Sequence, residues 1–103
     1  MIDSQNRRHL QQTKDLISDP ERWTTAVYAR DSDGYSVNQN SPDAVCWCLI
    51  GAFAKVSGFS VIHAGYRLYD MINCPPTDLN DHHGHQVVID YLDDLIENAD
   101  KTY

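Results

Sequence analysis

The sequence has few positively charged residues, with eight Lys and Arg against 15 Asp and Glu and a formal net charge of −7. Direct binding of nucleic acid requires clustered Lys and Arg side chains that displace the counterions around phosphates. This composition therefore argues against direct nucleic-acid binding. Any charged partner is expected to be basic, and we predict a protein partner with a basic surface.

Long hydrophobic runs are also absent. No stretch approaches the roughly 18 consecutive apolar residues that span a membrane, and the segment 1–14 is polar where a secretory signal is apolar. The sequence has three cysteines, and Cys46 and Cys48 lie too close together to form a useful cross-link, so a disulfide framework is not expected. We predict a cytoplasmic protein that does not bind membranes.

Familiar catalytic motifs are missing as well. The sequence contains no glycine-rich phosphate loop, no nucleophile elbow and no zinc-protease pair of histidines. No cofactor is expected. Catalysis stays open, but the absence of a specific motif favours a noncatalytic role.

The length and composition predict one folded domain over residues 1–103. A chain of 103 residues is long enough for one hydrophobic core and too short for two, and a hydrophobic content of 42% is typical of globular proteins. We predict a mainly α-helical fold with a small β-hairpin, an α+β arrangement. Its expected parts are an N-terminal helical segment over 1–18, a hairpin over 24–38 and a helical core over 42–99.

The strongest helix signal lies in the middle of the chain. Ser41 and Pro42 are typical of a helix start, because serine caps the first N–H groups and proline lacks an N–H that the first turn does not use. From Ala44 to Val56 nearly every residue is apolar, as in a helix that is buried on most sides. We predict about four helices packed around a central apolar helix at about 42–57. The other expected helices cover about 4–18, 60–73 and 85–99, and a loop is expected over 77–84.

The negative charge is concentrated in the last third of the chain. Residues 70–103 contain eight Asp and Glu against one Lys, whereas residues 1–69 contain seven of each sign. In the helix predicted over 85–99, the acidic side chains share the face opposite the apolar one. Like charges four residues apart destabilise a helix, and acidic residues near its C-terminus oppose the helix dipole. This acidic face therefore breaks two local rules without a local gain.

A basic partner surface would explain the acidic face, and this is our leading hypothesis for function. The protein would be a noncatalytic binding protein, in one version a phage or mobile-element inhibitor of a nucleic-acid-handling host protein. In the alternative interpretation, the acidic face is merely solvated and keeps the protein soluble. The predicted partner-binding residues are Asp90, Asp93, Asp94, Glu97 and Asp100.

A small hydrolase or transferase that depends on Cys and His is an alternative function. Cys46 or Cys48 would act as the nucleophile with His85, and Asp81 would orient the histidine. On the predicted central helix, Cys46 lies past the first turn, where the helix dipole no longer lowers a thiol pKa effectively. In the competing interpretation, both cysteines are ordinary small core residues.

A metal site is a further alternative, because the segment 80–85 is the densest polar cluster in the chain. His82, His83 and His85 are candidate ligands for a divalent metal. In the competing interpretation, Asn80 or Asp81 caps the last helix and the histidines are solvated. The two central cysteines do not extend this site, because residues two apart on a helix point roughly 200° away from each other.

Several short motifs occur in an order that resembles a known family. They are Trp23, Ala29-Arg30-Asp31, Gly34, Ala44-Val45-Cys46-Trp47-Cys48, Gly51-Ala52 and Asn80-Asp81. The pattern resembles a domain-of-unknown-function family of small bacterial and phage proteins, and the likeness spans about residues 16–96. The family pattern has Trp before the Asn-Asp pair, where this chain has Leu79, and a hydroxyl residue shortly after it, where this chain has histidines. The resemblance implies no activity, and its phage members favour binding to a host protein.

Overall fold

The structure is a computed structural model that describes residues 4–99, with side chains described as far as residue 97. Helices predominate, and one pair of short antiparallel strands completes the α+β fold that the sequence predicts. In chain order the elements are α1 (Ser4–Ile17), the 3₁₀ turn η1 (Pro20–Arg22), β1 (Ala29–Arg30), β2 (Cys46–Trp47), α2 (Leu49–Ser57), α3 (Val61–Ile72), α4 (Pro76–His83) and α5 (His85–Ala99).

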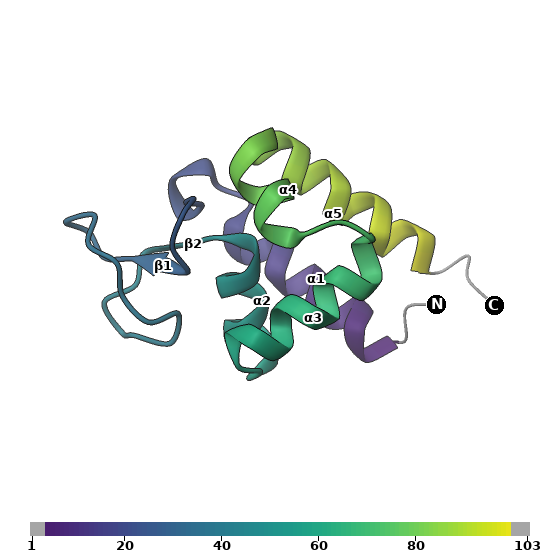
Figure 1. The fold of residues 1–103 in the computed structure, drawn as a ribbon, viewed down its shortest axis with the longest axis horizontal. Coiled ribbons are helices and arrows are strands. Elements are labelled where there is room, and N and C mark those ends of the chain that lie inside the picture. The colour runs from purple at the N-terminus through teal and green to yellow at the C-terminus, as the bar shows by residue number, and fades with distance from the viewer. Residues whose placement is uncertain (1–3, 100–103) are drawn as a thin grey trace.

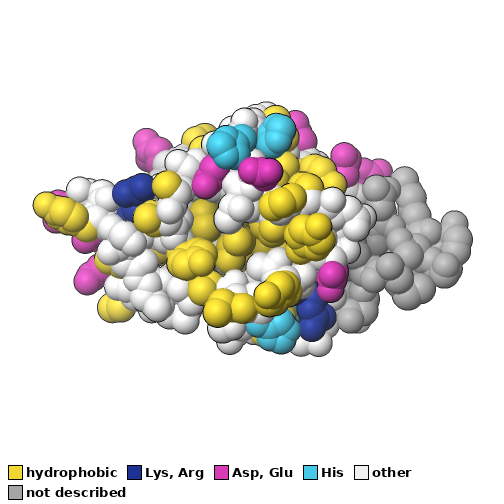
Figure 2. Space-filling view, in the orientation of Figure 1, with side chains coloured by type: hydrophobic (Ala, Val, Ile, Leu, Met, Phe, Trp, Pro, Cys, Tyr) yellow, Lys and Arg dark blue, Asp and Glu magenta, His cyan; other side chains and the backbone are white. Residues whose placement is uncertain are grey.

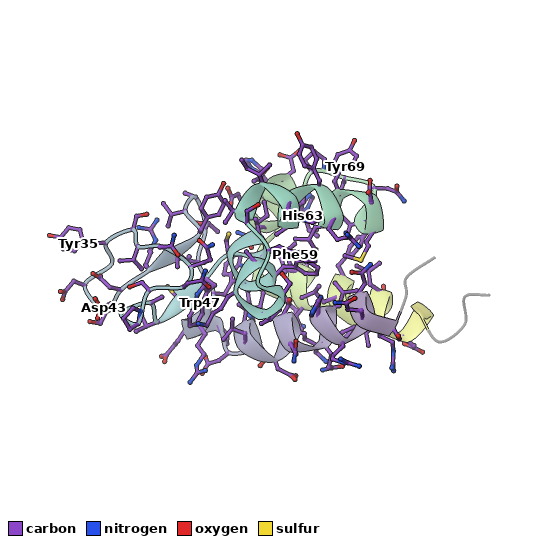
Figure 3. All side chains as sticks on the ribbon, turned by 90° about the horizontal axis from the view of Figure 1, so that it is seen from below. Tyr35, Asp43, Trp47, Phe59, His63 and Tyr69 are labelled. Carbon is purple, nitrogen blue, oxygen red and sulfur yellow. The ribbon has the colours of Figure 1, made fainter. Side chains whose placement is uncertain are left out.

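The helices form one body, and the segment between η1 and α2 extends from one end of it (Figure 1). The beginning of α1 and the end of α5 lie at the other end. Figure 3 shows Tyr35 and Asp43 at the tip of the extension, far from the helices. In the described part of the chain, no helix combines the length and the apolar character needed to cross a bilayer.

The helix α2 lies at the centre of the hydrophobic core, as predicted. Its residues 49–54 are all buried, and Phe53 is the largest fully buried side chain. The surrounding helices bury Leu10 from α1, Leu68 from α3 and Leu92 from α5. Consecutive burial over more than one turn is possible because helices cover α2 on several sides.

The predicted start of the central helix at residue 42 is wrong, because α2 begins at Leu49. Residues 46–47 form β2, which pairs with β1 in the register Ala29 with Trp47 and Arg30 with Cys46. The Val45 N–H donates to the Arg30 carbonyl at 2.9 Å, and the Trp47 indole donates to the Gln39 carbonyl at 3.0 Å. An apolar run is compatible with a buried strand as well as with a buried helix. Here the pairing with β1 and these hydrogen bonds favour the strand.

The predicted hairpin over 24–38 is only partly correct. Its turn is present, because the Asp31 side chain accepts from the N–H groups of Asp33 and Tyr35. However, its two arms meet in a single bridge between Arg30 and Ser36, and the true partner of β1 is β2. The Arg30 guanidinium stabilises this turn by donating to the Gly34 carbonyl at 2.9 Å.

The helices α3 and α5 agree with their predicted ranges, but the predicted loop over 77–84 is wrong. Ser60 caps α3 at its start, and Asn73, in the left-handed region with φ 59°, ends it. Residues 76–83 then form α4, which begins with Pro76 at its first position. Proline suits that position, and Leu79 supplies the buried contact that a short polar helix needs.

Candidate binding site

A pocket of about 330 Å³ lies where the N-terminal end of α2 meets α4 and the segment before β1. This volume is within the range of small-ligand sites, and the lining is more apolar than polar. Four separate parts of the chain supply its walls, so it exists only in the folded protein. The lining residues are Ala26, Val27, Tyr28, Ser36, Cys48, Ile50, Pro76, Thr77, Asn80 and Asp81.

Asn80 holds the floor of this pocket together and is only 2% exposed. Its Oδ1 accepts from the Trp23 indole at 2.7 Å and from the Leu49 N–H at 2.9 Å. Its Nδ2 donates to the Thr24 carbonyl at 3.0 Å and to Asp81 Oδ1 at 2.9 Å. Asn80 therefore does cap a helix, as one interpretation of the sequence predicted, but the helix is α2 and not the last one.

Asp81 lies at the edge of the pocket and is exposed. Besides the Asn80 amide, its Oδ1 accepts from the Ala26 N–H at 3.2 Å. Ala26 has φ 72°, a left-handed conformation that costs a non-glycine residue roughly 1–2 kcal/mol. Within the described residues, Oδ2 of Asp81 accepts no hydrogen bond, so this oxygen is available to a ligand.

Cys48 is the N-cap of α2, and its Sγ accepts from the Gly51 N–H at 3.3 Å. Burial raises the pKa of the Cys48 thiol above its ordinary value, and the nearby Asp81 carboxylate adds to the rise. Hydrogen bonds from backbone N–H groups oppose this rise but do not outweigh it. A thiol in this state is protonated at neutral pH, which is unfavourable for a nucleophile.

The structure brings two of the predicted catalytic residues, Cys48 and Asp81, to one pocket, but not His85 or Cys46. His85 Nε2 lies 2.6 Å from the Ile17 carbonyl oxygen, and its ring contacts Trp23 with centroids 5.5 Å apart. His85 does not line the pocket that contains Cys48 and Asp81. Cys46 lies in β2 and is partly exposed, and it is not a lining residue either.

The three candidate metal ligands lie in different environments. His82 and His83 are exposed in the last turn of α4, and His82 Nε2 lies 3.6 Å from Asp78 Oδ1. His85 is partly buried against the Ile17 carbonyl. Among residues 4–97, no group of three His, Cys, Asp or Glu side chains is arranged to hold a metal ion.

The acidic face of α5 lies beside α1, which carries positive charge. Lys14 forms an ion pair with Asp93, and Gln86 donates to Asp90 at 2.9 Å. Near the other end of α1, Arg7 and Arg8 line a hollow together with Ile96 of α5. Asp90, Asp94 and Glu97 are exposed, whereas Asp100 lies outside the described residues.

Exposed aromatic and aliphatic side chains lie along α3. Ile62, Tyr66 and Tyr69 are spaced for one face of the helix and are 70%, 72% and 50% exposed. Figure 2 shows hydrophobic side chains gathered on the face of the molecule where α3 and α4 are in front. Tyr69 points outward from α3 in Figure 3.

The joint role of Trp23 and Asn80, which are 57 positions apart, was not predicted from the sequence. The pocket beside Asp81 was not predicted either. The motifs that carry the family resemblance could have indicated both features. Five residues of these motifs meet at the N-terminal end of α2, namely Trp23, Cys48, Gly51, Asn80 and Asp81.

Comparison with curated proteins and with solved structures gives no match. A family model does match, and it covers residues 1–98, which is nearly the whole chain. Its description agrees with the resemblance seen in the motifs. The protein therefore belongs to DUF6197, a family of unknown function.

Proposed function

We propose that this protein is a noncatalytic binding protein that docks a basic protein partner on the face bearing the pocket. The observation that carries the proposal is the pocket itself, an apolar hollow with the carboxylate of Asp81 at its edge. None of the lining side chains is basic. The site therefore offers negative charge and apolar contact together.

The surroundings of the pocket support a macromolecular partner. The exposed residues Ile62, Tyr66 and Tyr69 of α3 and Tyr28 at the pocket provide large apolar contact areas. Tyrosine is enriched at protein interfaces because it combines apolar area with a polar end. The net charge of −7 favours a basic partner and accelerates its association.

The geometry gives less support to catalysis. A reactive cysteine needs a lowered pKa and a neighbouring base, whereas the pKa of Cys48 is raised and His85 contacts Ile17 and Trp23 instead. A basic nucleic-acid-handling enzyme inhibited by this protein is one partner with suitable chemistry. More specifically, we propose that the protein inhibits such an enzyme and that it is encoded by a phage or mobile element.

The acidic face of α5 is a second candidate for the same role. Asp90, Asp94 and Glu97 are exposed and lie within two turns of one another. However, Lys14 already pairs with Asp93, so the face presents less negative charge than the sequence of α5 suggests. The pocket is the stronger candidate because it combines charge with a concave apolar surface.

Partner capture from host lysate tests the two sites against each other. Thr77→Trp places a bulky ring at the pocket, and His83→Trp is its control, since both positions are exposed on α4 but only Thr77 lines the pocket. A third variant combines Asp90→Lys, Asp94→Lys and Glu97→Lys. We expect a basic protein to bind the native chain and His83→Trp in a salt-sensitive manner and to be lost with Thr77→Trp. Loss with the α5 variant alone would move the site to α5.

A further inference from the structure

We infer that the pocket receives a lysine side chain of the partner, with the ammonium group on Oδ2 of Asp81 and the aliphatic stem against the apolar wall. This assignment rests on the proposed function, because it names the group through which the partner docks. It follows from the charge, the hydrogen-bonding state and the shape of the pocket.

The charge of the pocket selects a cation. Asp81 contributes a carboxylate, and no Lys, Arg or His side chain lines the pocket to neutralise it. The N–H groups at the start of α2 would otherwise attract an anion, but those of Leu49 and Gly51 are occupied. Leu49 N–H donates to Asn80 and Gly51 N–H donates to Cys48 Sγ. The helix end is therefore capped internally, and an anionic ligand would find Asp81 and no free helix donor among these groups.

The hydrogen bonds of Asp81 favour lysine over arginine. Its Oδ1 already accepts from Ala26 and Asn80, and within the described residues only Oδ2 is open. A guanidinium pairs best when it donates to both carboxylate oxygens, whereas an ammonium acts as a point charge and needs one. A bidentate arginine would have to compete with the two bonds that hold Asp81 in place.

The apolar wall suits the stem of lysine. Val27, Ile50 and Pro76 line the pocket together with Asp81, and both Ile50 and Pro76 are buried. Lysine buries its four-carbon stem along apolar surface while its charge stays near water. Asp81 is exposed, so the ammonium would keep part of its hydration.

An NMR titration of the full chain tests the assignment. The probes are Nα-acetyl-lysine methylamide and its norleucine and arginine counterparts, and the signals are the amides of Ala26, Gly51 and Thr77. We expect the lysine compound to bind with a Kd of about 1 mM, typical of a small ligand. Norleucine, which lacks the charge, should bind about three- to tenfold more weakly, and arginine should not exceed lysine.

Asp81→Asn is the informative variant, because asparagine retains the Oδ1 acceptor and removes the charge. It should abolish the preference for lysine over norleucine, whereas Asp78→Asn on the same helix, outside the pocket lining, should retain it. Equal binding of lysine and norleucine by the native chain would overturn the assignment, as would no response to any probe. The capture experiment with Thr77→Trp judges docking on this face separately, so failure of lysine recognition and failure of the proposed function give different results.

Discussion

The carboxylates of Asp93 and Asp81 lie in contrasting environments. Asp93 on α5 meets the ammonium of Lys14 on the neighbouring helix, so its charge is compensated within the molecule. Asp81 on α4 accepts hydrogen bonds from neutral groups and lies beside an apolar pocket without a basic lining residue. The comparison shows that a carboxylate in a conspicuous acidic pattern can be neutralised by a basic side chain of the same molecule. An isolated carboxylate such as Asp81 can instead lack a basic neighbour.

Removing Asn80 should have the largest effect, because the pocket depends on it and the α5 face does not. Asn80→Ala leaves the partly buried Trp23 indole and the buried Leu49 N–H without their acceptor. Each unsatisfied buried group costs about 1–3 kcal/mol, so we expect the free energy of unfolding to fall by roughly 3 kcal/mol. Urea denaturation measures this change.

Asn38→Ala is the matched control, since Asn38 is exposed and its side chain bonds only to the nearby Asn40 N–H among the described groups. It should lower the free energy of unfolding by less than about 1 kcal/mol. Equal losses for the two variants would show that Asn80 does not organise the end of α2.

The two helical glycines give a second, smaller contrast. A Cβ at Gly51 would lie 2.1 Å from the Tyr28 carbonyl oxygen in the pocket wall, whereas a Cβ at Gly65 of α3 would lie 3.8 Å from the Ile50 side chain. Gly51→Ala should therefore destabilise the protein by about 1–3 kcal/mol through overpacking against backbone. Gly65→Ala should stabilise it by up to about 1 kcal/mol through helix propensity.

Thermal unfolding followed by circular dichroism distinguishes these outcomes, since the two variants should shift the melting temperature in opposite directions. A neutral Gly51→Ala would mean that the segment 26–28 can move away from α2. The pocket would then be adaptable rather than preformed.

Local sequence signals predicted the helices well where one physical effect dominated. Ser60 caps the start of α3 and Asn73 ends it, and the predicted apolar face of α5 contributes Val88 and Leu92 to the core. These features depend on neighbours three or four positions apart. The sequence therefore contained what was needed to locate them.

The pocket could not be predicted in the same way, because it depends on contacts between distant segments. The apolar run 44–48 became a strand through pairing with β1, and Cys48 thereby became a cap instead of an interior helical residue. Asn80 was expected to cap the nearest helix in sequence but caps one that begins 31 positions earlier. Residue types identified Asp81 as a candidate, whereas its partners Ala26 and Asn80 required the fold.

The smallest expected effect concerns the ion pair between Lys14 and Asp93, which tests the α5 side of the comparison. The two side chains are 27% and 48% exposed, so water screens their attraction. A double-mutant cycle with Lys14→Met and Asp93→Asn should give a coupling free energy of about 0.2–1 kcal/mol that decreases at high salt.

Asp94→Asn is the control for this cycle, because Asp94 is exposed and has no partner among the described residues. Its removal should leave stability unchanged or raise it slightly by relieving the like-charge contact with Asp90 four residues earlier. If Lys14→Met couples as strongly to Asp94→Asn as to Asp93→Asn, the charge of α1 acts on the whole acidic face rather than on one carboxylate. Fewer negative charges would then be available to a partner on α5, and the pocket beside Asp81 would be favoured further as the docking site.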